Sequence, residues 1–252
     1  MCLIAWNWQP GEPNPLLLVA NRDEFYARPT AALHWWEEAP ILAGRDLQAG
    51  GTWLGVSRSG RLAALTNHRD PAMTRSDAPS RGDLVSQFLR GEMSAGDYLT
   101  QLQPQAALYN PFNLLVFDGT TLMGLQSRDE RILTMAPGVG AVSNADFHTP
   151  WPKLSALRLG LQNSLAQGPA SDTQLLALLH DRTPAADAAL PATGIALDLE
   201  RALSAAFVAM PGYGTRASSV VRYASNQIMF LEHRFDEHGA AGASCESFAI
   251  HY

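Results

Sequence analysis

Short apolar runs separated by turn residues dominate the first part of the chain. Each run has about the length of a strand, and polar, proline or glycine residues lie between them. The glycine in the short connection after residue 57 is typical of a hairpin. The four runs cover residues 3–8, 16–20, 52–57 and 62–66. They predict four strands, in two hairpins, ahead of the first convincing helix.

Helical patterns occupy the middle of the chain, and strand patterns return at its end. Ser80 and Ser94 are each followed three residues later by Asp, which resembles a weak capping box, and leucines after residue 152 recur at helical spacing. Helices are expected from Ser80, from Ser94, and over residues 152–167, 171–180 and 198–207. Further strands are expected over residues 112–117, 122–125, 218–223, 227–234 and 247–252.

The order of these elements limits the fold. Neither a sheet nor a helix can leave its apolar face in water, so two antiparallel sheets are expected to pack face to face with the helices outside. With 252 residues, 46% of them hydrophobic, the chain can bury a large core and stays within the size of one domain. The sequence therefore predicts an α+β fold, a four-layer αββα sandwich, as a single domain over residues 1–252.

Composition and charge exclude several classes of protein. The net charge is −6 and the basic residues are dispersed, so the sequence lacks the basic stripe that binds nucleic acid. No apolar run approaches the roughly 18 to 20 residues of a transmembrane segment, and the first residues lack the pattern of a secretory signal. We expect a cytoplasmic protein. The sequence does not indicate an oligomeric state.

The histidines and cysteines do not form a metal-binding pattern. His233 and His238 are five positions apart, which places them on opposite faces of a strand, and Cys2 and Cys245 are distant in sequence. No metal site is predicted, and both cysteines are expected to be free thiols. The motifs C-x-x-C-H and H-E-x-x-H do not occur, which excludes covalent c-type haem and the common metalloprotease helix as motif-based assignments.

Cys2 is the most informative position in the sequence. A cysteine directly after the initiator Met becomes the first residue when Met1 is removed. Its α-amine, with an ordinary pKa of about 7.7 to 8.0, is then available to take the proton of the adjacent thiol. Nucleophile and base would belong to one residue. The alternative is that Cys2 is a small apolar residue at the start of a core strand.

Four polar residues, 21–24, directly follow a buried strand, and two of them suit this chemistry. Arg22 would lower the pKa of the Cys2 thiol by placing a cation beside it, and Asp23 would accept hydrogen bonds from the α-ammonium. This arrangement requires only that the first two predicted strands are neighbours. A surface turn is the alternative explanation.

Three more candidates lie near the ends of other strands. Asn67 follows a strand and could donate a hydrogen bond to the oxygen that becomes negative in acyl transfer. Asn144 would bind substrate or supply a second donor. Arg216, in a glycine-rich segment, would bind a carboxylate or orient the site. Each asparagine also fits an ordinary turn.

Several sequence blocks resemble those of a known family, in the usual order and over essentially the whole chain. They are MCLIAW, VANRDEFYARPT, AGRDLQAGGTWLGV, ALTNHRD, SNADFHTPWPKL and GTRASSVV. The chain is identified as a member of the NRDE, or Transport and Golgi organisation protein 2, family. That family is similar to N-terminal cysteine hydrolases such as penicillin V acylase and bile salt hydrolase. The resemblance implies an N-terminal-nucleophile hydrolase fold, and it carries the catalytic roles of those enzymes to Cys2, Arg22, Asp23, Asn67, Asn144 and Arg216.

Two functional hypotheses follow. The first is a hydrolase of non-peptide C–N bonds that needs no cofactor, in which Cys2 cleaves a small acylated amine. The second comes from the resemblance, because members of the family have been linked to haem trafficking and to acyl-CoA or lipid handling. It is a noncatalytic carrier that holds haem or an acyl chain in the same cleft. The six tryptophans fit either a core or an apolar cleft wall.

Overall fold

Two antiparallel sheets form the centre of the molecule, and the computed structural model describes residues 1–250. Sheet A has the strand order β10-β1-β2-β12-β13-β14, with β11 paired to β12, and sheet B has the order β3 to β9. The strands of sheet A are β1 (Cys2–Trp8), β2 (Leu16–Phe25), β10 (Gly138–Val142), β11 (Ala209–Met210), β12 (Tyr213–Ala224), β13 (Gln227–Asp236) and β14 (Gly239–Ala249). Those of sheet B are β3 (Thr30–Trp35), β4 (Ile41–Asp46), β5 (Leu54–Ser57), β6 (Leu62–Asn67), β7 (Phe112–Phe117), β8 (Leu122–Gln126) and β9 (Arg131–Thr134).

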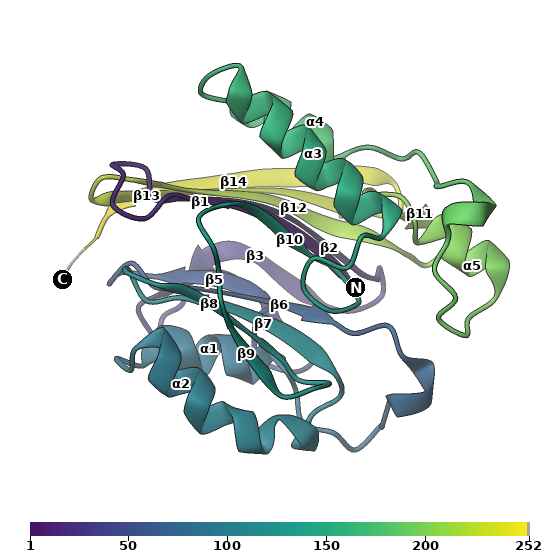
Figure 1. Cartoon of the computed structure of the whole chain (residues 1–252), viewed down its shortest axis with the longest axis horizontal. Coiled ribbons are helices and arrows are strands. Elements are labelled where there is room, and N and C mark those ends of the chain that lie inside the picture. Colours follow the sequence, from purple (N-terminus) through teal and green to yellow (C-terminus); the bar gives the residue numbers. More distant parts are fainter. Residues whose placement is uncertain (251–252) are drawn as a thin grey trace.

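Helices cover the outer face of each sheet. In Figure 1, α3 and α4 lie over sheet A, α1 and α2 lie under sheet B, and α5 stands at one end of sheet A. Their bounds are α1 (Gly82–Arg90), α2 (Ala95–Leu102), α3 (Pro152–Ala166), α4 (Asp172–Leu179) and α5 (Leu197–Ala202). None of the helices in residues 1–250 is both long and apolar enough to cross a membrane. The four layers confirm the predicted αββα sandwich.

Alternation along the strands fills the core and decides which side chains can meet. In β1, Ile4, Trp6 and Trp8 pack between the sheets, whereas Leu3 and Ala5 pack in the cluster that contains the leucines of α3 and α4. Successive side chains of a strand point to opposite faces, and β2 follows the same rule in register with β1. Even-numbered residues of both strands therefore face sheet B, and odd-numbered residues face the helices.

The sequence pattern does not predict β3, β4, β9 or the two-residue β11. Because β3 and β4 lie early in the chain, six strands, not four, precede the first α-helix. β3 and β9 are the two edges of sheet B, and most of their side chains are only partly buried. An edge strand does not need a clear apolar face, which removes the signal. β4 ends in the polar residues Arg45 and Asp46, both at the cleft described below.

The strands that carry candidate residues are longer than expected. β2 continues to Phe25, so residues 21–24 lie within a strand and not in a surface turn. β12 begins at Tyr213, so the glycine-rich segment before residue 218 is also strand. α5 ends at Ala202, whereas a helix was expected to residue 207. The last expected strand corresponds to β14, which ends at Ala249, and residues 251 and 252 lie outside the described part.

Candidate functional site

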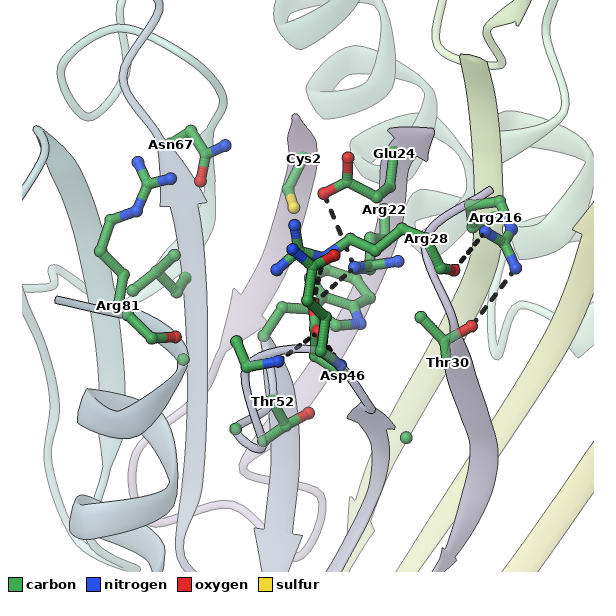
Figure 2. Close-up of a pocket in the computed structure, with 18 of the residues that line it drawn as sticks. Cys2, Arg22, Glu24, Arg28, Thr30, Asp46, Thr52, Asn67, Arg81 and Arg216 are labelled. Atoms are coloured by element: carbon green, nitrogen blue, oxygen red, sulfur yellow. Dashed lines mark hydrogen bonds and ion pairs between the residues drawn. The ribbon is translucent and has the colours of Figure 1, made fainter. Parts of the chain in front are cut away.

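A cleft of about 450 Å³ opens where the ends of β1, β2 and β12 approach the ends of β4 and β6. Figure 2 shows the Cys2 sulfur pointing into it, between Asn67 on one side and Arg22 on the other. The cleft is lined by five of the six predicted residues, namely Cys2, Arg22, Asp23, Asn67 and Arg216. The fold thus brings together residues from opposite ends of the chain. Asn144 is not among the lining residues and lies behind Asn67.

The first pair of the site follows from strand register. Cys2 of β1 is opposite Arg22 of β2, which confirms that their strands are neighbours, and both side chains face sheet B. The Arg22 Nη2 atom lies 3.4 Å from Asp46 Oδ2 and 3.7 Å from Glu24 Oε2. These two carboxylates hold the buried guanidinium in place beside the thiol.

Burial dominates the chemistry of the Cys2 thiol while Met1 is present. The residue is 5% exposed, and burial raises the pKa of its thiol to about 11, although the amino-terminal charge and Arg22 lower it. At neutral pH the thiol is therefore protonated. Because the thiolate is the nucleophilic form, attack by Cys2 requires a base close to the sulfur.

Met1 precedes β1, and its main chain pairs with Asp23 of β2. Its carbonyl accepts a hydrogen bond from the Asp23 N–H, and its ammonium donates to the Asp23 carbonyl and, at 2.9 Å, to the Tyr213 hydroxyl. Its thioether accepts a hydrogen bond from Arg69 Nε at 3.3 Å. Without Met1, the α-amine of Cys2 would become the end of the strand and would face the volume that Met1 fills.

The Asp23 carboxylate lies on the other face of sheet A from the thiol. Oδ1 accepts a hydrogen bond from Thr215 Oγ1 at 2.8 Å, and Oδ2 lies 4.0 Å from Lys153 Nζ of α3. The main chain of Asp23 holds the Met1 ammonium, whereas its carboxylate makes no hydrogen bond to that ammonium. The predicted contact between carboxylate and amine is thus not formed while Met1 is present.

The two asparagines have different places. Asn67 ends β6 and lines the cleft. Asn144 is completely buried, donates from Nδ2 to the Asn67 carbonyl at 3.0 Å, and accepts at its own carbonyl from the Arg69 N–H at 2.7 Å. Its neighbour Ser143 donates to the Cys2 carbonyl at 3.2 Å. Asn144 therefore fixes the strand end that carries Asn67, and its amide is not directed at the cleft as a substrate ligand would be.

Arg216 lies at a bulge in β12, where the pairing with β2 shifts between Thr215 and Ala217. Its guanidinium donates to main-chain carbonyls and to one hydroxyl, those of Phe25, Tyr26, Arg28, Phe235 and Thr30. These bonds tie β12 to the β2–β3 connection and to β13. Of the two roles predicted for Arg216, the geometry fits orientation of the site, because few of its donors remain for a carboxylate.

Sequence reasoning missed several charged residues around the cleft. Arg28 donates to Asp46, the same carboxylate that contacts Arg22, and Arg81 lines the cleft at the start of α1. Lys153 stands behind Asp23, and a signal for it was available, because it is the only lysine in the sequence. The others give no local signal, since arginine is frequent in this chain.

The described residues offer no metal centre in this region. No group of three or more His, Cys, Asp or Glu side chains within residues 1–250 is arranged to hold a metal ion. No histidine is among the described residues that line the cleft, and Trp53 is the only tryptophan among them. Trp6 and Trp8 pack in the core between the sheets. The cleft is therefore walled mainly by polar and charged groups.

The chain is similar in sequence to known proteins. The sequence model of the family Transport and Golgi organisation 2 matches residues 1–237. The chain is 36% identical over 255 residues to the Transport and Golgi organization protein 2 homolog of Bos taurus and 33% identical over 255 residues to that of Homo sapiens, with 92% of both chains covered in each case.

A solved structure shares the fold. It is a C2A mutant of conjugated bile acid hydrolase from Clostridium perfringens, with a TM-score of 0.55 at 8% sequence identity, covering 100% of this chain and 97% of that one. At this identity the likeness concerns the four-layer fold alone.

Proposed function

Because the chain belongs to the Transport and Golgi organisation 2 family and has an N-terminal-nucleophile hydrolase fold, we propose that it is an amidohydrolase whose nucleophile is Cys2. One observation carries the proposal. Cys2 begins β1 with its thiol in a charged cleft beside Arg22, and it directly follows Met1, so that removal of Met1 would give Cys2 a free α-amine. The hydrolase with the similar fold was itself studied as a C2A mutant, which supports attention to this position.

The proposed reaction uses the two groups of one residue. After removal of Met1, the neutral α-amine of Cys2 takes the thiol proton, and Sγ bonds to the carbonyl carbon of the substrate. The oxygen that becomes negative accepts a hydrogen bond from the Asn67 amide. The α-ammonium then gives its proton to the leaving nitrogen as the C–N bond breaks. Water, deprotonated by the same amine, hydrolyses the thioester, and the acid and the free thiol are released.

The charge of the cleft supports a substrate whose amine part carries an acidic group. The lining residues include seven arginines, which are Arg22, Arg28, Arg45, Arg75, Arg81, Arg216 and Arg234. They include the carboxylates of Glu24, Asp46 and Glu232, whereas the Asp23 carboxylate lies on the other face of sheet A. Burial raises the pKa of Glu232. A cleft with excess positive charge in a chain of net charge −6 is suited to a carboxylate or phosphate on a small acylated amine.

Turnover by matched variants tests the proposal. Protein without Met1, verified by intact mass, is incubated with a panel of N-acyl amino acids, and the released amine is measured. Cys2→Ala should abolish release while the far-ultraviolet spectrum and melting temperature remain close to those of the parent. Cys245→Ala, which removes the exposed cysteine of β14, is the control and should retain full turnover. Equal turnover by the Cys2→Ala variant would overturn the assignment.

A noncatalytic carrier is the second candidate, and the state of the Met1-bearing chain favours it. There the thiol is buried and protonated, and the amine that would serve as base belongs to Met1. If Met1 is retained, the same cleft would hold an anionic acyl ligand or haem without chemistry. Haem would have to use Cys2 or Met1, because no described histidine lines the cleft. No change in melting temperature or haem absorbance on adding acyl-CoA or haem would count against this function.

A further inference from the structure

Lys153 is an unusual residue in this chain. The sequence contains 18 lysine and arginine residues, and Lys153 is the only lysine among them. It is the second residue of α3, and its side chain is 2% exposed. Arginine is more weakly hydrated and is the common choice for a buried cation, so a single buried lysine calls for an explanation.

The position of Lys153 connects it to the amino terminus. α3 packs on β1 and β10, and the lysine Nζ atom lies 4.0 Å from Asp23 Oδ2. Neither of these two atoms has a hydrogen-bond partner within residues 1–250. The main chain of the same Asp23 holds the Met1 ammonium. The lysine charge therefore lies directly behind the strand end where the catalytic amine would be.

Electrostatics couples the two amines. Burial lowers the pKa of Lys153 to about 8, Asp23 raises it, and Arg69 lowers it. Burial also lowers the pKa of the Met1 amine, Cys2, Asp23 and Glu24 raise it, and Lys153 lowers it further. The charged and titratable groups that face this end of the strand are Arg22, Asp23 and Glu24 of β2, Tyr213 of β12, Arg69 with its partner Glu200, and Lys153 of α3.

We propose that Lys153 is a positioning residue of the amino-terminal site: its ammonium, held against Asp23, keeps the Cys2 α-amine unprotonated at neutral pH once Met1 is removed. This inference rests on the proposed function. An unprotonated amine can take the proton from Sγ as the sulfur bonds to the carbonyl carbon, and can later pass that proton to the leaving nitrogen. Lys153 keeps its own proton throughout and touches neither substrate nor sulfur.

The protonation of the α-amine can be measured without catalysis. In a Cys2→Ser background lacking Met1, the α-amine and Lys153 are the only amines, so trace acetylation mapped by mass spectrometry between about pH 5 and pH 10 titrates each separately. Lys153→Met should move the α-amine titration up by about one pH unit, so that acetylation at neutral pH falls about tenfold. Lys153→Arg should retain the parent titration. Arg158→Met, which removes a cation from the same helix that acts on His148, should also leave it unchanged.

Two further measurements separate a structural role from an electrostatic one. Lys153→Gln keeps a donor for Asp23, so it tests the charge if Lys153→Met does not fold, and it should give the same upward shift. In protein with Cys2, the acid limb of the kcat/KM profile should move to higher pH with either variant and return with Lys153→Arg. An α-amine titration identical in the parent and in Lys153→Gln would overturn the inference. A shifted titration in a protein that hydrolyses no amide would overturn the proposed function alone.

Discussion

Arg81 offers a direct test of the substrate class. It lines the cleft at the start of α1, and Figure 2 shows its guanidinium extending toward Asn67. Nη1 donates to the Pro111 carbonyl at 3.2 Å, and no carboxylate in residues 1–250 forms an ion pair with the guanidinium. Burial lowers the pKa of Arg81, and Cys2 and Glu24 raise it. An acidic substrate group would supply the missing partner.

The expected magnitude follows from the bond that would be lost. A hydrogen bond to a charged group contributes about 1.5 to 3 kcal/mol, which is about 10- to 150-fold in kcat/KM. Because Arg81 is only partly buried, the lower end of this range is expected. Arg81→Met should therefore reduce kcat/KM for N-hexanoylglycine relative to its neutral isostere N-hexanoylglycinamide by about 10- to 50-fold.

The assay compares this ratio in three proteins and with a third substrate. Arg90→Met is the matched control, because Arg90 is on the same helix, is exposed, and contacts Glu38 away from the cleft. It should leave the ratio at the parent value. N-hexanoylaminomethylphosphonate tells whether the site prefers a phosphate-like or a carboxylate group. An unchanged ratio between glycine and glycinamide substrates in Arg81→Met would refute the argument that the guanidinium binds the acidic group.

Three further predictions concern packing, a helix start and the thiol. Gly140→Ala should destabilise the protein by about 1 to 3 kcal/mol in urea denaturation, because the added Cβ would lie 2.3 Å from Trp6 Cζ2; an unchanged midpoint would contradict this packing. Ser171→Ala should lower the free energy of unfolding by about 1 kcal/mol, because it removes the capping box with Gln174 at the start of α4. A loss below a few tenths of a kcal/mol in the same assay would argue against the cap. In the Met1-bearing chain the folded pKa of Cys2 is raised from 9.0 to about 11, so the folded state keeps a proton that the unfolded state loses. The free energy of unfolding of the Met1-bearing chain, measured relative to that of Cys2→Ala, should therefore be constant below about pH 9. It should fall by on the order of 2 to 3 kcal/mol as the pH rises to about 11. A difference between the two proteins that does not depend on pH would contradict burial of the thiol.

Much of the site could be predicted because it depends on local patterns. The first two apolar runs predict neighbouring strands next to Cys2 and Arg22, and in the structure the register puts these two residues opposite each other. Asn67 was expected at a strand end and ends β6. These features depend on alternation and on short connections, both of which are visible in sequence.

The orientation of Asp23 was not predicted, because residues 21–24 were taken to follow the strand. Within β2, alternation sends Arg22 and Glu24 to the cleft and Asn21 and Asp23 to the helices. Asn21 is fully buried there and donates to the Leu179 carbonyl. Residues 21–24 therefore direct their side chains to both faces of sheet A, and this follows only once β2 is known to extend to Phe25.

The partners of Arg216 and Lys153 are determined by tertiary structure and could not be predicted from local sequence patterns. The Arg216 guanidinium contacts main-chain carbonyls from two distant segments, and no side-chain pattern records such contacts. Lys153 meets Asp23 because α3 crosses sheet A, and a helix crossing is not encoded in local periodicity. The edge strands β3 and β9 escaped prediction for a different reason, which is their partial burial.

Labelling of Cys2 with and without Met1 tests the central claim most directly. Protein produced with and without methionine aminopeptidase is verified by intact mass, treated briefly with iodoacetamide at neutral pH, and mapped, with the exposed Cys245 as an internal reference. Only chains without Met1 should be labelled at Cys2 faster than at Cys245, and only they should release amine from N-hexanoylglycine. Equal labelling of Cys2 in both forms, or an inert Cys2 and no amine release in chains without Met1, would contradict an amino-terminal nucleophile.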